Sequence, residues 1–258
     1  MPKSKHSENF LPEVIFQVAA IVPAAGSSTR FGAAGVKSSK QFQKLGGFPL
    51  LVHVLRALEL SYVNVVYIAA PPGRVTWVRR EIVQAYGFRK VRLVIKGGKT
   101  RGESVQRCVE RIPTSYDVLL VHDGARPLVT PRLINQVAAA AYESGAALAA
   151  IPETDTIKRA QFASTPKGVS GSSRSWTRKT VEREALWRAQ TPQAFRSEIF
   201  RKALLHAKQI GFNGTDDASY VERVGERVRL IPGDVRNLKV TNPEDLLLAE
   251  ALQSLSKT

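Results

Sequence analysis

The sequence has little of what builds disulfide-rich domains or metal centres. Its 258 residues include one cysteine and four histidines, while 43% of them are hydrophobic. A single cysteine excludes an internal disulfide framework, so the chain must fold on a sizeable apolar core. Cys108 stands in a stretch of helical periodicity and is predicted to be a packed helix residue rather than a nucleophile. The histidines are scattered along the chain, which argues against a structural zinc: His6, His53, His122 and His206.

Long apolar runs are also missing. No stretch approaches the roughly 20 apolar residues that a membrane-spanning helix needs. Residues 1–17 mix Lys3 and Lys5 with Glu8 and Glu13, so they match neither a secretory leader nor an acid-poor transit peptide. We therefore expect residues 1–17 to be a flexible tail on a cytoplasmic protein that has no membrane partner.

Acidic residues are scarce relative to basic ones. Asp and Glu number 22 against 38 Lys and Arg, a formal net charge of +16. Residues 158–202 carry eleven Lys or Arg and three Glu, a surplus of eight that is half of the total. Aromatic side chains do not interleave with these cations as they do on single-strand-binding surfaces. An anionic small molecule fits at least as well as nucleic acid, and a basic nucleic-acid-binding protein remains the alternative from another functional class.

The most informative stretch is an apolar run followed by a loop of small residues. Residues 18–23 predict a buried strand, and the small residues after it let a ligand approach the backbone N–H groups. Arg30 and Lys40 follow, where a guanidinium fork and an ammonium could neutralise phosphates. The loop also resembles the signature loop of sugar-phosphate nucleotidyltransferases, and this resemblance implies that it binds a nucleotide through Pro23, Ala24, Ala25 and Gly26.

Two common phosphate loops do not match this stretch. It lacks the Gly-Lys-Ser/Thr ending of a P-loop, and it is not G-x-G-x-x-G. The next predicted strand, residues 63–70, ends in Ile68-Ala69-Ala70, without an acidic residue to hold a ribose. The pattern therefore argues against a P-loop protein and against a dehydrogenase.

Predicted strands alternate with predicted helices along the chain. We expect strands at 18–23, 63–70, 91–95, 117–122, 146–151 and 227–231, and helices at 49–60, 75–86, 100–112, 130–144, 198–209 and 243–255, with an acidic helix start at 215–217. This alternation predicts an α/β fold, a Rossmann-like mostly parallel sheet with helices on both faces. Ligands bind such sheets beyond the carboxyl ends of the strands, which places the site at the loops near Ala24, Gly97, Asp123 and Glu153.

The alternation stops between residues 159 and 179, a basic stretch rich in Ser and Gly. A structureless segment of about 20 residues is uncommon inside a compact domain, so we expect a projecting β-hairpin arm. Residues 18–258 should then form a single domain with this arm inserted at about 154–180. Because most soluble oligomers are two-fold symmetric, we expect a homodimer in which two arms pack together.

Two further motifs lie at the expected site. Asp123 follows a predicted strand, where a carboxylate next to phosphates would hold Mg²⁺; the alternative is a loop-capping aspartate paired with Arg126. The stretch Gly97-Gly98-x-x-Arg101-x-x-Ser104 offers a tight turn for close approach to a base or ribose. Gly98 and Ser104 are its candidate nucleotide-binding residues.

In chain order, the motifs form one series: Pro23-Ala-Ala-Gly-x-x-x-Arg30, Lys40-Gln41, Gly97-Gly-x-x-Arg101-x-x-Ser-Val, Val121-His-Asp-Gly-Ala-Arg-Pro, Asp155-Thr-Ile-Lys158, Thr180-Val-Glu-Arg183, Leu186-Trp-x-Ala-Gln-Thr191-Pro-Gln, Thr215-Asp-Asp-Ala-Ser and Asn237-Leu-Lys239-Val-Thr-x-Pro-Glu-Asp245. No single motif is decisive. The ordered series closely resembles the 2-C-methyl-D-erythritol 4-phosphate cytidylyltransferase family, from Val18 to Leu252.

The resemblance implies a reaction of non-mevalonate isoprenoid synthesis. The phosphate of methylerythritol phosphate would attack the α-phosphorus of CTP, releasing pyrophosphate and forming 4-diphosphocytidyl-2-C-methyl-D-erythritol. Such a transfer needs positioning and charge neutralisation more than proton transfer, and the basic motifs agree with it.

The resemblance also implies residue roles. Catalysis would rest on Arg30, Lys40, Arg183 and Lys239, with Mg²⁺ at Asp123. The residues implied for methylerythritol phosphate are Asp123, Arg126, Thr156, Arg183, Thr191 and Lys239. Thr156 and Arg183, at the base of the arm, would reach the nucleotide loop of the partner subunit.

The chain departs from the family pattern at two places. Ser39 precedes Lys40 where the family usually has proline, and the segment 31–39 is longer than usual, so Lys37 competes with Lys40 for the lysine role. Lys99 follows the Gly-Gly pair where relatives often have an acidic residue near the base or ribose. The nearest alternative function is a cytidylyltransferase that acts on ribitol 5-phosphate.

Separate substitutions distinguish the two lysines. We expect Lys40→Ala and Arg30→Ala each to lower turnover at least about a hundredfold without unfolding the protein, because each removes one preorganised charge. Steady-state kinetics with circular dichroism measures both effects. Near-normal turnover in Lys40→Ala together with an inactive Lys37→Ala would assign the role to Lys37 instead.

Overall fold

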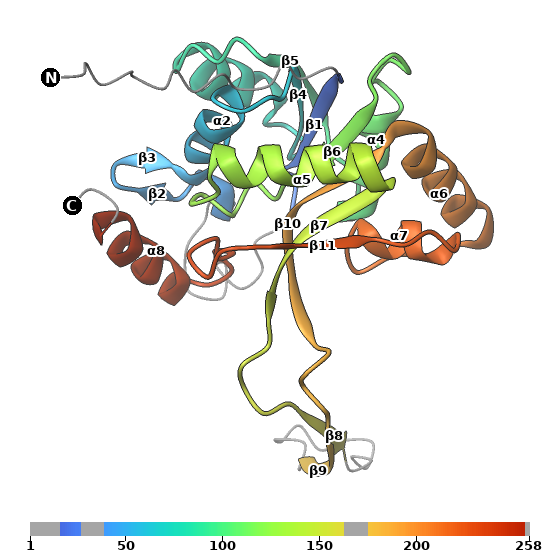
Figure 1. Cartoon of the computed structure of the whole chain (residues 1–258). Helices are drawn as coiled ribbons and strands as arrows, with labels where there is room; N and C mark the ends of the chain where they lie inside the picture. Colours follow the sequence, from blue (N-terminus) through green and yellow to red (C-terminus); the bar gives the residue numbers. More distant parts are fainter. Residues whose placement is uncertain (1–15, 27–38, 163–174, 256–258) are drawn as a thin grey trace, which may run out of the picture.

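The computed structural model describes residues 16–26, 39–162 and 175–255 (Figure 1). Most of the predicted tail, the loop cations Arg30 and Lys37, and the tip of the arm lie outside the described residues. In the part of the chain that is described, no helix is long and apolar enough to cross a membrane.

The core is one seven-stranded sheet in the order β11-β7-β10-β6-β1-β4-β5. Its strands are β1 Val18–Pro23, β4 Val65–Ala70, β5 Val91–Lys96, β6 Val118–Val121, β7 Ala146–Pro152, β10 Trp187–Arg196 and β11 Arg229–Pro232. Neighbouring strands are parallel except where β10 lies antiparallel between β6 and β7. The predicted mostly parallel sheet is confirmed, and every predicted strand is present.

Strand β10 was not predicted, for a physical reason. Its first three residues are exposed, and the six residues that follow are buried although they include Gln190, Thr191 and Gln193. A proline stands in its middle, and its register against β7 shifts between Ala189 and Gln193. Proline normally signals an edge strand or no strand, so the sequence shows neither alternation nor an apolar run here.

Helices cover both faces of the sheet, as predicted. They are α2 Leu50–Glu59, α3 Val75–Trp77 with the π-helical η2 Val78–Gln84, α4 Arg101–Val109, α5 Pro131–Ser144, α6 Ser197–Ile210 and α7 Ala218–Arg223. Helix α8 Pro243–Leu255 lies beside the sheet and packs against Leu45 and Leu50. Alternate residues of β1 face opposite sides. Ala20 and Val22 pack with α2, η2 and α5, whereas Ala19 and Ile21 pack with α4, α6 and α7.

The helix predicted at 75–86 and the predicted role of Cys108 can both be compared with the structure. The predicted helix 75–86 is a single turn of α-helix that continues as a π-helix. Cys108 lies on the buried side of α4, and burial raises the pKa of its thiol to about 12. A thiol that stays protonated is not a nucleophile, which agrees with the predicted packing role.

The loops after β1 and β5 are packed tightly against each other at the carboxyl edge of the sheet. The Ala24 N–H donates to the carbonyl of Ala69, and the Gly97 N–H to the carbonyl of Ala70, both at 2.8 Å. A Cβ atom at Gly97 would overlap the Cβ of Ala25. Glycine is therefore required at this position to bring the two predicted nucleotide loops together.

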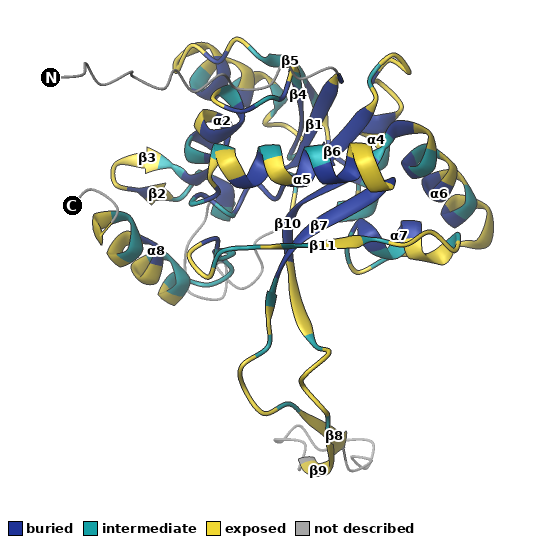
Figure 2. Cartoon of the chain, viewed as in Figure 1, coloured by how far each residue is buried: buried dark blue, intermediate teal, exposed yellow. Residues whose placement is uncertain are grey.

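A hairpin arm projects from the sheet, as predicted (Figure 1). Its strands β8 Lys158–Phe162 and β9 Ser175–Thr180 pair antiparallel. Figure 2 shows the arm as an exposed extension, and the Trp176 side chain on it is 57% exposed. A second, two-stranded hairpin, β2 Lys44–Leu45 with β3 Phe48–Pro49, follows the short 3-10 helix η1 Lys40–Phe42.

Candidate active site

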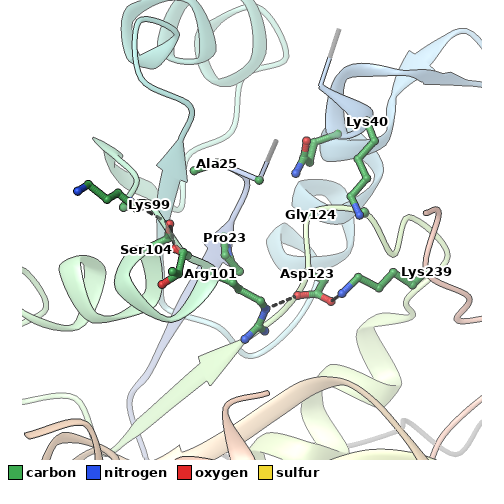
Figure 3. Close-up of a pocket in the computed structure, with 14 residues that line it drawn as sticks. Pro23, Ala25, Lys40, Lys99, Arg101, Ser104, Asp123, Gly124 and Lys239 are labelled. Carbon is green, nitrogen blue, oxygen red and sulfur yellow. Dashed lines mark hydrogen bonds and ion pairs between the residues drawn. The ribbon is translucent and has the colours of Figure 1, made fainter. Parts of the chain in front are cut away.

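A pocket of about 290 Å³ opens at the carboxyl edge of the sheet (Figure 3). Eight of the predicted site residues line it: Pro23, Ala25, Gly26, Lys40, Gly98, Ser104, Asp123 and Lys239. Ala24 lies buried beneath the pocket wall. Lys40 enters from η1, on the opposite side of the pocket from Lys99 and Ser104 (Figure 3). This pocket therefore brings together predicted site residues from five separate parts of the chain.

The Gly97-Gly98 turn is fixed by the first turn of α4. The Gly98 N–H donates to the Ser104 hydroxyl at 3.0 Å, and that hydroxyl donates to the Thr100 carbonyl at 2.9 Å. Thr100 is the N-cap of α4 and accepts from the N–H of Glu103. The Glu103 carboxylate accepts from the N–H of Lys99, the residue before the N-cap, so two hydrogen bonds tie Glu103 to the turn. The turn is thus held rigidly where a flat base could approach it.

Asp123 is the charged centre of the pocket. Its side chain is almost buried, and its two oxygens face different cations: Arg101 Nε donates to Oδ1 at 3.0 Å, and Lys239 Nζ lies 2.7 Å from Oδ2. Arg126 Nε lies 4.0 Å from Oδ2. Burial alone would raise the pKa of Asp123, but Arg101 and Lys239 hold it far below its usual range. Asp123 is therefore ionised at any physiological pH, and its pairing with Arg126 is the weakest of the three.

Arg101 and Asp217 extend this centre, and the sequence did not assign them a role. Arg101 Nη2 donates to Asp217 Oδ2 at 2.6 Å, so one guanidinium joins two carboxylates. Burial lowers the pKa of Arg101, but Asp217 and Asp123 raise it above its ordinary value. Burial raises the pKa of Asp217, against the pull of Arg101. Both residues belong to quoted motifs, yet the sequence gives no sign that the two motifs meet.

A buried histidine, His122, holds the Asp123 loop in place through hydrogen bonds. His122 Nε2 lies 3.2 Å from the carbonyl of Arg126, to which only a protonated nitrogen can donate. Nδ1 therefore accepts from the Thr191 hydroxyl at 3.1 Å, and that hydroxyl accepts the Asp123 N–H at 3.0 Å. Burial lowers the pKa of His122 to about 4, so the ring stays neutral. Thr191, implied as a substrate residue, also holds the Asp123 backbone in place.

A smaller pocket of about 160 Å³ adjoins the larger one. Arg101, Asp123 and Lys239 line both pockets and so form the wall between them. The predicted residues Arg126 and Thr191 line the smaller pocket. Two adjoining spaces with a shared charged wall can hold two reactants side by side.

Two predicted site residues do not join this assembly within the chain. Thr156 and Arg183 are exposed at the base of the arm and line neither of the two pockets. The Arg183 Nη1 donates to the Thr154 carbonyl at 2.7 Å. Arg30 lies outside the described residues. The single chain therefore brings together the nucleotide loops, Asp123, Arg126, Thr191 and Lys239, but not the residues of the arm.

The described residues fit a metal ion only together with substrate. They contain no group of three or more His, Cys, Asp or Glu side chains that could hold a metal. Among the described residues that line the larger pocket, Asp123 is the carboxylate. Mg²⁺ commonly binds through one or two carboxylates while phosphates and water fill its remaining positions. Asp123 suits that arrangement.

The neutral state of His122 predicts a stability change with pH. In the unfolded chain its pKa returns to about 6.5, so below that pH the unfolded state binds a proton that the folded state does not. The free energy of unfolding should fall between pH 7 and pH 4 by about 3 kcal/mol more in the wild type than in His122→Gln. Urea unfolding at several pH values measures both slopes, and parallel slopes would contradict the neutral assignment.

Comparisons with known proteins identify the family. A family model described as 2-C-methyl-D-erythritol 4-phosphate cytidylyltransferase matches residues 18–254. A relative of that name from Geobacter metallireducens is 41% identical over 238 residues, which are 91% of this chain and 96% of the relative. A crystal structure of that name from Thermus thermophilus is 34% identical, with a TM-score of 0.69, and covers 92% of this chain and 99% of its own. The resemblance inferred from the motifs is thus confirmed, and the chain belongs to the 2-C-methyl-D-erythritol 4-phosphate cytidylyltransferase family of nucleotidyltransferases.

Proposed function

We propose that this protein transfers the cytidylyl group of CTP to 2-C-methyl-D-erythritol 4-phosphate, forming 4-diphosphocytidyl-2-C-methyl-D-erythritol and pyrophosphate. The observation that carries the proposal is the pair of adjoining pockets that share Arg101, Asp123 and Lys239. CTP occupies the larger pocket, and the phosphate of the acceptor occupies the smaller one. The acceptor phosphate and the α-phosphorus then meet at the shared wall.

The nucleotide is recognised through the backbone and through cations. Its base and ribose lie against the loop from Pro23 to Gly26 and against the Gly98 turn that Ser104 holds in place. Lys40 and Arg30 neutralise the triphosphate. The family resemblance and the lining of the larger pocket support these roles.

The transfer proceeds by attack of an acceptor phosphate oxygen on the α-phosphorus, with cleavage of its bond to the pyrophosphate. The attacking phosphate is already ionised, so no general base is required. The nearest histidine, His122, is neutral and fully buried, and both its ring nitrogens are hydrogen-bonded inside the protein. Lys239 and Arg126 neutralise the acceptor phosphate, and Asp123 would hold a Mg²⁺ ion, which would neutralise the phosphates of CTP. The chemistry thus rests on fixed charge rather than on proton transfer.

The residues of the arm complete the acceptor site from another chain. Thr156 and Arg183 are exposed and lie outside both pockets of their own chain, and the arm projects away from the domain. A two-fold dimer of arms would place each arm base near the site of the other subunit. Arg183 then binds the acceptor phosphate in trans.

Pyrophosphate release tests the proposed reaction. We expect release when the protein is incubated with CTP, Mg²⁺ and methylerythritol phosphate, little release with ribitol 5-phosphate, and none when Mg²⁺ is chelated. Faster turnover of ribitol 5-phosphate would favour the alternative cytidylyltransferase. A protein that releases no pyrophosphate with either acceptor, and binds nucleic acid with a steep salt dependence, would instead be a nucleic-acid-binding protein.

Mixed dimers test the contribution of the arm. Lys40→Ala and Arg183→Ala homodimers should each be inactive. If Arg183 acts in trans, every mixed dimer has one intact site, so random exchange should restore roughly a quarter of wild-type activity. The measurement is pyrophosphate release after demonstrated subunit exchange.

The matched control mixes Lys40→Ala with Lys239→Ala. Both lysines line the same pocket of one chain, so no exchange can rebuild a complete site. Recovery of activity in the first mixture but not in the control supports a role of Arg183 in the site of the partner subunit. No recovery in either mixture would show that Arg183 serves its own chain, and an active Arg183→Ala homodimer would show that Arg183 takes no part.

A further inference from the structure

Arg101 is the cation in the wall between the two pockets that the family resemblance left without a role. It is the first residue of α4, directly after the N-cap Thr100, so its backbone is fixed by the hydrogen bonds of Glu103 to Thr100 and Lys99. The next residue, Gly102, lies so close to the Tyr220 hydroxyl that a Cβ atom there would overlap it. This close approach joins the start of α4 to α7 and brings Arg101 to Asp217, the residue before α7.

The hydrogen bonds of Arg101 leave donors free. A guanidinium has five N–H groups. Within the described part of the chain, Nε donates to Asp123 and Nη2 donates to Asp217, while Nη1 has no hydrogen bond. The exposed part of the side chain, 28% of it, opens onto the two pockets that Arg101 lines. Unused donors on a largely buried cation at a phosphate site point to an anionic ligand.

Asp217 has no evident purpose other than to hold Arg101. Its side chain is completely buried, and although it is the N-cap residue of α7 it makes no capping hydrogen bond. Among the described residues its Oδ1 has no hydrogen-bond partner. A buried carboxylate lowers stability unless it is paired, and here its partner is Arg101. The pair therefore fixes the rotation of the guanidinium.

We propose that Arg101 is a further catalytic residue, whose free Nη1 donates to a non-bridging oxygen of the α-phosphate while charge develops there, and that Asp217 is its positioning residue. This inference rests on the proposed cytidylyl transfer. Asp123 holds one edge of the guanidinium and Asp217 holds another. Nη1 is held by neither carboxylate, and Arg101 lines both pockets, between which the phosphorus would change partners.

The test must separate catalysis from stability. Arg101→Met should lower kcat about a hundredfold, the scale for one preorganised donor, with a smaller change in the KM for CTP. It should also lower the Tm, because Asp217 is left unpaired. The double variant Arg101→Met/Asp217→Asn removes that buried charge, so the Tm should recover while kcat stays low. Recovery of kcat in the double variant would show that Arg101 only balances charge, and would overturn the proposal.

Arg201 provides a matched control. It is a partly buried arginine that donates to the carbonyls of Val109 and Ile112 at the far end of α4, and it lines neither pocket of the site. Arg201→Met should lower the Tm and leave kcat unchanged. This comparison shows whether destabilisation alone lowers turnover.

The two diastereomers of α-thio-CTP locate the contact. If Arg101 donates to one non-bridging oxygen, replacing that oxygen by sulfur should lower the turnover of the wild type. In Arg101→Met the ratio of turnover with CTP to turnover with α-thio-CTP should then fall for one diastereomer only. An unchanged thio effect in Arg101→Met would overturn the proposal. Wild-type turnover of CTP is measured first, so failure of the proposed function is seen separately from failure of the role of Arg101.

Discussion

The ion pairs of Asp123 are the interaction on which the rest of the site depends. This carboxylate is nearly buried, yet Arg101 and Lys239 keep it ionised. Its partners come from α4 and from the segment before α8, and its backbone is held by Thr191 of β10. Segments that are distant in sequence are thus tied to the carboxyl end of β6. Because the Asp123 loop is held by several segments, its carboxylate and the neighbouring cations keep fixed positions.

The rigid centre contrasts with the exposed arm. The sheet and its helices complete the nucleotide pocket within one chain, whereas Thr156 and Arg183 remain exposed outside it. A hairpin with so little buried surface gains little stability from its own packing. The proposed dimer accounts for both features, because a partner would cover the arm and receive its residues.

Local sequence patterns predicted what depends on local physics. Strands β1, β4 and β6 are apolar runs, and the bounds of α8 agree with its proline and its acidic first turn. Strand β10 was not predicted, because the hydrogen bonds of its buried glutamines form only in the tertiary structure. Gln193, for example, donates to Asp216 and accepts from the Ala218 N–H. The Arg101–Asp217 bridge spans 116 positions in sequence and likewise has no local signal. The motifs named both Asp123 and Lys239, which are in contact in the structure, but they did not predict the network that joins them.

The bridge between Arg101 and Asp217 also bears on why the site is built from buried charge. Replacing a buried ion pair by apolar residues of similar volume is often neutral or stabilising, so such a pair is poor evidence of a need for stability. Asp217 in addition leaves one oxygen without a partner among the described residues, a further cost to folding. A site that transfers a phosphoryl group must already have its dipoles and charges in place when the transition state forms. The buried pair lowers stability and supplies that preorganisation, which is the balance expected where a fold is selected for its chemistry rather than for its stability.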